Sequence, residues 1–170
     1  MRTALAAALL LVASACGFQL RGSATLPFDT LYVPNPTSGI ALDLKRNIES
    51  GTGTRVVDDP RGAQARLQFS EETRTKDILS LNASGRVREY RLIYRVGFRV
   101  VDGKGGEYLP TRVITLSRDI TYDDTVALAK ESEEELLFKD MQADMVHQIV
   151  RRLAAAEPPA PQAPTAPKAQ

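Results

Sequence analysis

The sequence predicts an α+β fold in which two helices pack on one face of a roughly four-stranded, mostly antiparallel sheet. Two patterns support this prediction. Apolar residues occupy every second position over residues 86–101, which is typical of a strand with one buried face. Apolar residues recur at every third or fourth position over residues 125–155, which indicates an amphipathic helix. A shorter helix and shorter strands precede them, so the expected order is strand, helix, strands, helix.

Three short strands are expected in the first half of the chain. They cover residues 30–33, 55–57 and 65–71. Prolines end the first strand, and Leu67 and Phe69 alternate with polar residues in the third. A turn follows at residues 82–85.

The first helix is expected over residues 40–50. Its apolar residues share one face at four-residue spacing: Ile40, Leu44 and Ile48. Ser38 or Thr37 can cap its N-terminus, because a side-chain oxygen there can accept a hydrogen bond from a free backbone N–H. Gly51 stands where a left-handed helix end is favoured.

The strand over residues 86–101 has one apolar and one charged face. The apolar face consists of even-numbered residues: Tyr90, Leu92, Tyr94, Val96, Phe98 and Val100. A glycine-rich turn over residues 102–106 leads into a partner strand over residues 108–122. The even-numbered face is therefore expected to pack under the helices.

Several arginines decorate the same strand: Arg86, Arg88, Arg91, Arg95 and Arg99. Two interpretations remain open. The arginines form a solvated sheet face that pairs with acidic residues of neighbouring strands. Alternatively, they bind a phosphorylated ligand through bidentate guanidinium contacts.

The second helix is expected over residues 125–155. Asp123 and Asp124 stand at its start, where negative charge suits the helix dipole, and Arg151 and Arg152 stand near its end. Its apolar stripe repeats at four-residue spacing: Leu137, Met141, Met145, Ile149 and Leu153. This stripe predicts the face that packs on the sheet.

The first 15 residues read as a lipoprotein signal peptide. Arg2 is followed by an apolar run that is too short to span a bilayer. Small residues then stand directly before Cys16, the only cysteine of the chain. This pattern predicts cleavage before Cys16, acylation of its thiol and attachment to a membrane by the lipid. The alternative is an ordinary signal peptide cut nearby, which would leave a free thiol.

The charge balance and length of the chain after cleavage limit the classes of protein to which it can belong. One of the 22 Lys and Arg residues is Arg2, and without it the basic residues equal the 21 acidic residues. Such a balance is not the profile of a nucleic-acid binder. Residues 16–156 are long enough for one domain with a core. Residues 157–170 contain five prolines and are expected to form a disordered tail that buries nothing.

No catalytic or metal site is expected. His147 is the only histidine, and no cysteines are placed to complete a zinc site with it. No serine or cysteine nucleophile has an evident base partner. The adjacent acids Asp58–Asp59 and Asp123–Asp124 suit turns and helix starts better than acid–base chemistry. The prediction is a protein that is not an enzyme and has no cofactor besides the lipid on Cys16.

Several segments, in order along the chain, resemble one family. The most specific are Cys16-Gly17-Phe18-Gln19-Leu20-Arg21-Gly22 at the start and Ala127-Leu128-Ala129-Lys130 at the second helix. Shorter matches are Glu89-Tyr90, Lys139-Asp140-Met141, Gln148-Ile149 and Arg152-Leu153. With these segments the chain resembles LptE, the family of lipopolysaccharide-assembly lipoproteins, whose fold has two helices and four strands.

The resemblance implies an outer-membrane lipoprotein that faces the periplasm. LptE proteins form a translocon with the β-barrel LptD, which they help to assemble and which they plug, and they bind lipopolysaccharide. Gly17 agrees with an outer-membrane location, because many inner-membrane lipoproteins carry Asp there. The resemblance also implies that Lys130 binds lipopolysaccharide. A second binding residue of the family, an arginine, falls on Ala83 here, so Arg86 and Arg88 are the nearby substitutes.

A different class of function shares the same anchor and fold. The chain could be a membrane-tethered scaffold or assembly factor that contacts only protein partners. Binding of lipopolysaccharide distinguishes the two functions.

Overall fold

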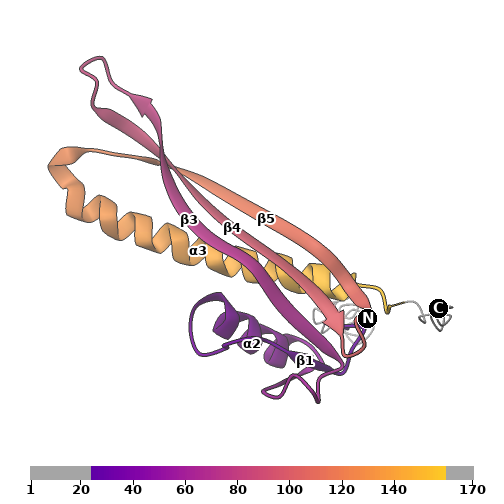
Figure 1. The fold of residues 1–170 in the computed structure, drawn as a ribbon. Helices are drawn as coiled ribbons and strands as arrows, with labels where there is room; N and C mark the ends of the chain where they lie inside the picture. The colour runs from indigo at the N-terminus through magenta and orange to yellow at the C-terminus, as the bar shows by residue number, and fades with distance from the viewer. Residues whose placement is uncertain (1–23, 160–170) are drawn as a thin grey trace, which may run out of the picture.

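The computed structural model describes residues 24–159, so the signal peptide, Cys16 and most of the Pro-rich tail lie outside the described residues. The described chain forms an elongated two-layer structure (Figure 1). Its elements are β1 (Thr30–Tyr32), α2 (Gly39–Gly51), β2 (Arg55–Val57), β3 (Ala65–Leu81), β4 (Val87–Asp102), β5 (Glu107–Thr121), a 3-10 turn (Asp124–Val126) and α3 (Ala127–Ala154).

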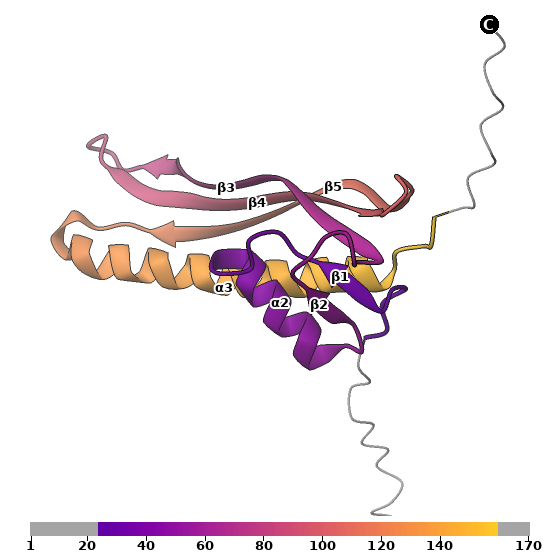
Figure 2. The ribbon, with the colours of Figure 1, turned by 60° about the horizontal axis from the view of Figure 1, so that its bottom comes forward.

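The sheet has five strands in the order β2-β1-β3-β4-β5, and both helices lie on one of its faces (Figure 2). The three long strands β3, β4 and β5 pair antiparallel. β1 pairs parallel with both β2 and β3, because α2 crosses from the end of β1 back to the start of β2. The predicted fold class is confirmed: the sheet is mostly antiparallel, with five strands instead of roughly four and with parallel pairing at one edge.

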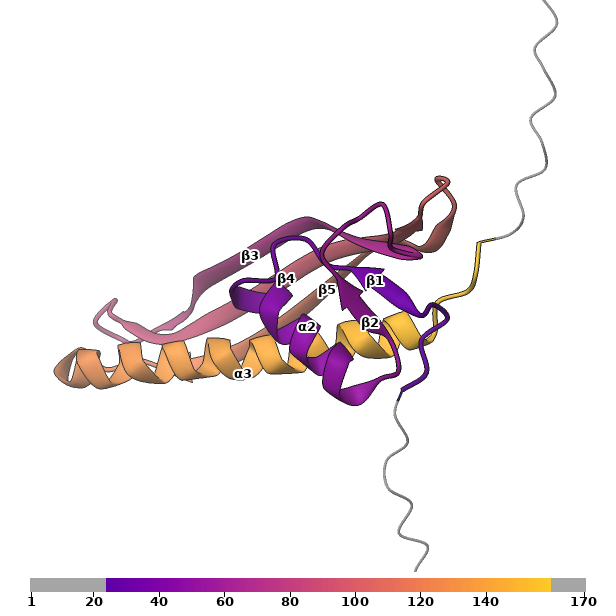
Figure 3. The same ribbon diagram turned by 90° about the horizontal axis from the view of Figure 1, so that it is seen from below.

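The core lies where both helices cover the sheet. Leu92, Tyr94, Val96, Phe98 and Val100 are fully buried on the helix side of β4, as the two-residue pattern predicts. The helices contribute the predicted stripes, Ile40, Leu44 and Ile48 from α2 and Met141, Met145, Ile149 and Leu153 from α3. The first buried residue of α3 is Met141, so its N-terminal half lies over the sheet without entering the core (Figure 3).

β3 is much longer than the strand expected over residues 65–71. It pairs with β4 from Ala65 to Leu81, with a bulge between Phe69 and Glu71. The bulge changes the phase of side-chain alternation. Beyond it, Glu72, Arg74 and Lys76 pair opposite buried residues of β4 and so lie on the helix side of the sheet. The distal half of β3 therefore presents charges where its first half presents Leu67 and Phe69.

The ends of α2 differ from expectation. Ser38 stands at the N-terminus, but its side chain makes no capping hydrogen bond. Gly51 is the last helical residue rather than a left-handed end. The helix ends at Thr52, whose backbone N–H and hydroxyl both donate to the carbonyl oxygen of Ile48, at 3.0 and 2.8 Å. The hydroxyl and backbone amide of Thr52 thus satisfy a carbonyl oxygen in the last turn of the helix, a role that was expected of a left-handed residue at Gly51.

The chain beyond α3 makes a contact that the tail prediction did not include. The side chain of Pro159 lies against Gly106 in the turn between β4 and β5. Gly106 is buried there, and a Cβ added to it would be 2.7 Å from Pro159 Cβ. Glu157 and Pro158 are exposed and Pro159 is partly buried, and residues 160–170 lie outside the described residues, so the disordered tail stays a prediction. Over the described residues, no helix has both the length and the apolar character needed to cross a membrane.

Candidate functional site

Three segments meet at the end of the sheet farthest from residue 24, called here the distal end (Figure 1). They are the β3–β4 loop over residues 82–86, the last residues of β5, and the turn from β5 into α3. The backbone N–H of Tyr122 donates to the carbonyl oxygen of Arg88 at 2.8 Å, which ties the turn to β4. The three residues for which the family resemblance implies lipopolysaccharide binding, Arg86, Arg88 and Lys130, lie at this end.

The β3–β4 loop is a fixed turn, as predicted. Asn82 Oδ1 accepts hydrogen bonds from the backbone N–H groups of Ser84 and Arg86, both at 3.0 Å. Gly85 adopts a left-handed conformation with φ of 78°. An asparagine that bonds its own turn in this way restricts the backbone that carries Arg86. Ala83 is exposed in the same loop and contributes no charge.

Arg86 and Arg88 line a pocket of about 260 Å³ with Asn82, Val87, Tyr122, Asp123, Asp124 and Thr125. Within residues 24–159, neither arginine forms an ion pair. Asp123 is engaged in the turn, because its Oδ1 accepts from the backbone N–H and hydroxyl of Thr125 at 2.9 and 2.7 Å. These hydrogen bonds, followed by the charge of Lys130, lower the pKa of Asp123. The pocket therefore combines two guanidinium groups that form no ion pair with two carboxylates, of which Asp123 is hydrogen-bonded in the turn and Asp124 is exposed.

Lys130 lies beside this pocket but is not free. Its Nζ donates to Glu133 Oε2 at 2.9 Å and to Thr121 Oγ1 at 3.2 Å. Its side chain is 19% exposed. The structure thus brings Lys130, Arg86 and Arg88 to one end of the molecule and shows Lys130 paired along its own helix. A ligand phosphate would have to take the place of Glu133.

The sequence did not single out Lys76, which carries a further positive charge at this end. Its Nζ is 2.5 Å from Glu134 Oε2 and 4.3 Å from the centre of the Tyr90 ring. Tyr90 in turn packs edge-on against Tyr122, with ring centres 5.2 Å apart. No local pattern revealed Lys76, because the strand that carries it extends past residue 71 only through pairing with β4.

The remaining arginines of β4 show which of the two interpretations, cross-strand pairing or phosphate binding, describes the outer face of the sheet. Arg91 binds both carboxylate oxygens of Asp119 at 2.8 and 3.0 Å. This hydrogen bonding raises the pKa of Arg91 and lowers that of Asp119. Arg95 is 3.7 Å from Glu71, and Arg99 donates to the side-chain amide oxygen of Gln68 at 2.7 Å. These three arginines pair across strands on a solvated face, as the first interpretation predicts.

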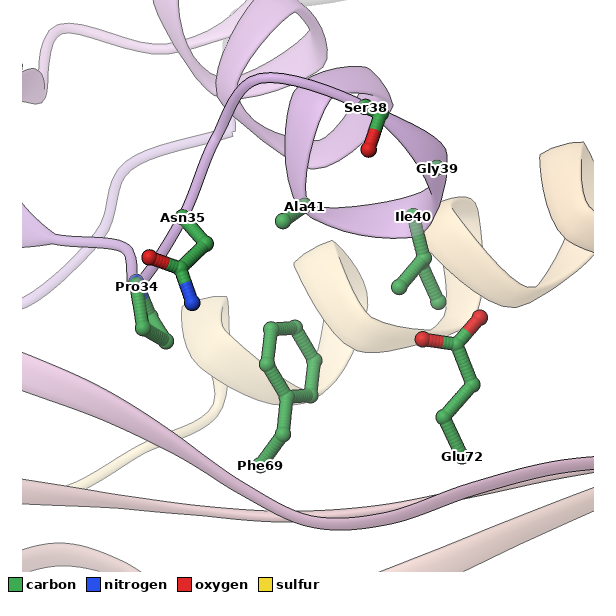
Figure 4. A pocket seen from close by; sticks show the side chains of 8 residues that line it. All are labelled: Pro34, Asn35, Ser38, Gly39, Ile40, Ala41, Phe69 and Glu72. Atoms are coloured by element: carbon green, nitrogen blue, oxygen red, sulfur yellow. The ribbon is translucent and has the colours of Figure 1, made fainter.

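A second hollow, of about 410 Å³, lies at the start of α2 (Figure 4). Phe69 and Glu72 project into it from β3 toward the first turn of the helix. Glu72 Oε1 already accepts a hydrogen bond from the hydroxyl of Tyr94 at 2.7 Å. Burial, together with this bond, raises the pKa of Tyr94. The single carboxylate is committed to the core, so this hollow lacks the free charges of the distal end.

Residues 28–153 match the family model LptE, described as Lipopolysaccharide-assembly. The chain belongs to the LptE family. The LPS-assembly lipoprotein LptE of Yersinia enterocolitica is 30% identical over 148 residues, covering 84% of this chain and 70% of that protein. The corresponding protein of Pectobacterium atrosepticum is 25% identical, covering 84% of this chain and 79% of its own length.

Solved structures of lipoproteins show the same architecture. An uncharacterized lipoprotein B from Nitrosomonas europaea is 41% identical, with a TM-score of 0.71 over 82% of this chain and 91% of that one. The rare lipoprotein B from Shewanella oneidensis is 28% identical, with a TM-score of 0.63 over 74% and 92%. Arg86, Arg88 and Lys130 fall inside the segment that matches the LptE model, whereas Cys16 precedes it.

Proposed function

We propose that this LptE-family chain is an outer-membrane lipoprotein of the lipopolysaccharide translocon. In this role it faces the periplasm, assists the assembly of the LptD β-barrel, plugs it, and binds lipopolysaccharide on its way to the outer leaflet. The observation that carries the ligand-binding part is the cluster of Arg86, Arg88 and Lys130 at the distal end. The names of the LPS-assembly relatives support the same assignment.

The chemistry of the distal end suits a phosphorylated sugar head. A guanidinium group offers paired N–H donors that match two phosphate oxygens. Arg86 and Arg88 are exposed, and within the described residues neither forms an ion pair, although Asp123 and Asp124 line the same pocket. Lys130 would add a third positive charge once Glu133 is displaced. The lipid on Cys16 serves as the anchor, and the protein's contribution is binding rather than catalysis.

Charge reversal at the two free arginines tests this function. The double variant Arg86→Glu/Arg88→Glu should bind purified lipopolysaccharide at least about ten- to a hundredfold more weakly, because the loss of even one charged hydrogen bond costs about 1.5–3 kcal/mol. A matched control is Arg46→Glu/Arg55→Glu, which changes charge equally at exposed positions away from the distal end. Circular dichroism checks the fold, and co-purification with LptD checks the plug role separately.

The result also separates the two classes of function. Weaker lipopolysaccharide binding with intact LptD co-purification supports the translocon component. A wild-type chain that captures LptD but binds no lipopolysaccharide would instead identify a scaffold that contacts only protein.

A further inference from the structure

We propose that Lys76 is a further ligand-binding cation of the distal end, and that Glu134 occupies its ammonium group until a phosphate of a phosphorylated lipid replaces it. The inference rests on the proposed function, because it adds a cation and a competing carboxylate to the same lipopolysaccharide site. Neither residue follows from the sequence pattern or from the family resemblance.

Lys76 shares an aromatic residue with the pocket of the distal end. Its ammonium nitrogen lies 5.7 Å from the centre of the Tyr122 ring. Tyr122 lines the pocket together with Arg86 and Arg88. Lys130 is bonded to Thr121, the residue before Tyr122. A ligand that carries more than one phosphate and covers Tyr122 therefore meets positive charges from β3, β4 and α3.

Two aromatic rings and one carboxylate surround the ammonium group of Lys76. Of these, only the carboxylate neutralises its charge. The faces of Tyr90 and Tyr122 attract a cation but carry no net charge. Glu134 Oε2, at 2.5 Å, supplies the neutralising charge. The side chains of Lys76 and Glu134 are 32% and 23% exposed, so water and ligand reach both. A phosphate monoester carries about −1.5 to −2 charges at neutral pH and can displace a carboxylate of charge −1.

The helix that carries Glu134 can yield before Leu137 without exposing the core, because Leu137 and Phe138 are the first apolar residues of α3 that pack against it. The partly buried residues that continue the sheet-facing stripe of α3 before Met141 include Lys130 and Glu134. Their partners on the sheet are the polar groups of Thr121 and Lys76. Separation of such groups replaces protein contacts with water or ligand contacts, whereas separation at Met141 would expose buried apolar surface.

An apolar neighbour indicates that the ligand is a lipid rather than a free phosphate. Ile78 follows Lys76 on the same face of β3, because it pairs opposite Tyr90. Ile78 is 60% exposed, and Leu81 at the end of the strand is 55% exposed. A cation beside an exposed aliphatic side chain matches a molecule that joins a phosphate group to acyl chains.

Two substitutions with opposite expected effects test the exchange in the full-length lipidated protein. Lys76→Gln should weaken lipopolysaccharide binding about five- to tenfold at low salt, the size expected for loss of one cation contact. Glu134→Gln should strengthen binding about threefold or more, because it leaves Lys76 without its competitor. Glu135→Gln is the matched control, since Glu135 forms an exposed pair with Lys139 at 2.9 Å on the same helix.

Three further ligands identify the source of the phosphate. Dephosphorylated lipopolysaccharide, phosphatidylglycerol vesicles and inorganic phosphate are compared with lipopolysaccharide. The proposal expects the Glu134→Gln gain only with lipopolysaccharide. A gain with phosphatidylglycerol alone would overturn the assignment to the lipopolysaccharide head, and a gain with inorganic phosphate alone would overturn the lipid class.

The outcomes separate this inference from the proposed function. If Glu134→Gln weakens binding or leaves it unchanged while the Arg86/Arg88 variant loses it, the Lys76–Glu134 pair is structural and the proposed function stands. If the wild-type chain binds no lipopolysaccharide, the proposed function itself fails. If Lys76→Gln lowers the unfolding temperature so far that binding is not measurable, Glu134→Gln decides alone, because it keeps the cation in place.

Discussion

At the scale of single residues, Gly97 determines which face of β3 carries its charges. Gly97 lies on β4 opposite Glu71, where β3 bulges at Ser70. A Cβ added to Gly97 would collide with Ser70 Oγ and stand 2.9 Å from Glu71 Cγ. The bulge therefore needs a partner without a side chain. The bulge turns Lys76 toward the helices. Gly97, which accommodates the bulge, therefore helps to place the charge of Lys76 at the distal end.

The variant Gly97→Ala should destabilise the domain by about 1–3 kcal/mol, the usual cost of forcing a methyl group into a packed site. Gly51→Ala is the control, since nothing lies within 4 Å of a Cβ at that helical position. It should leave stability unchanged or raise it by up to about 1 kcal/mol. Urea unfolding of both variants measures the difference. Equal midpoints for Gly97→Ala and wild type would mean that the bulge is not constrained by Gly97.

The sequence predicted the positions of single residues correctly where a pattern extends over many residues. It failed where a single tertiary contact determines the position of a residue. The even-numbered residues of β4 from Leu92 to Val100 are buried as predicted, because alternation over many residues leaves one register. Lys130 entered through resemblance, and geometry then placed it next to the pocket. Lys76 was not predicted, since a bulge depends on the partner strand and leaves no periodic signal. The helix end assigned to Gly51 is formed by Thr52.

At the scale of elements, α3 is one helix with two kinds of contact. From Met141 onward its sheet-facing residues are fully or nearly fully buried. Before Met141 it is held by the Lys76–Glu134 pair and by the Lys130–Thr121 bond. Arg74 of β3 lies at the boundary between the buried and the polar contacts of α3. Its guanidinium lies 4.8 Å from the centre of the Tyr94 ring and hydrogen-bonds Gln142. Leu137 and Phe138 also pack partly buried against the core, so residues 127–136 are the part of α3 that is attached mainly by polar contacts.

Hydrogen exchange should show this division. Backbone amides of residues 127–136 are expected to exchange at least about tenfold faster than those of residues 141–153, because the opening of this segment exposes little apolar surface. Raising the salt concentration should widen the difference, since salt screens the exposed pairs that hold the first half. Mass spectrometry of proteolytic peptides measures both halves in one experiment. Uniform protection along α3, unchanged by salt, would contradict a polar attachment.

The elements themselves were predictable to different degrees. β4, β5 and both helices were expected from periodicity, and their boundaries shift by only a few residues. The distal half of β3 was missed because Glu72, Arg74 and Lys76 face the helices and break the apolar alternation. The parallel pairing of β1 with β2 was missed as well. Strands of three residues carry too little pattern to state their direction, which follows from the crossover through α2.

At the scale of the whole molecule, the elongated shape separates the end near Ala24 from the distal end (Figure 3). α3 has 28 residues and is therefore about 42 Å long at the usual helical rise. Ala24 bridges Thr52, directly after α2, and β1 pairs with the first residues of β3, at the end of the sheet opposite the β3–β4 loop. A chain that runs from Cys16 to Ala24 can span at most about 28 Å. A lipid on Cys16 would therefore keep Ala24 within about 28 Å of the site of attachment.

The segment that joins Cys16 to the described residues is short compared with the length of the folded domain. A loss of the lipid would therefore release Ala24 from this distance to the site of attachment. Family membership and fold do not depend on the anchor, because the matched segment begins at residue 28. The anchor and the binding site can accordingly be tested apart.

The variant Cys16→Ser tests the anchor. It should shift the chain from the membrane fraction to the soluble fraction or leave it as an unprocessed precursor, because no acyl chain is attached. Each buried acyl CH₂ contributes about 0.8 kcal/mol, and one chain alone binds a membrane only marginally, so stable attachment depends on the complete lipid. Globomycin, which blocks signal peptidase II, should make the wild-type precursor accumulate. Mass spectrometry of the mature wild-type chain provides the decisive measurement. An N-terminal Cys16 with the mass of a diacylglyceryl group is expected, whereas an unmodified thiol would show that the chain is exported without an anchor.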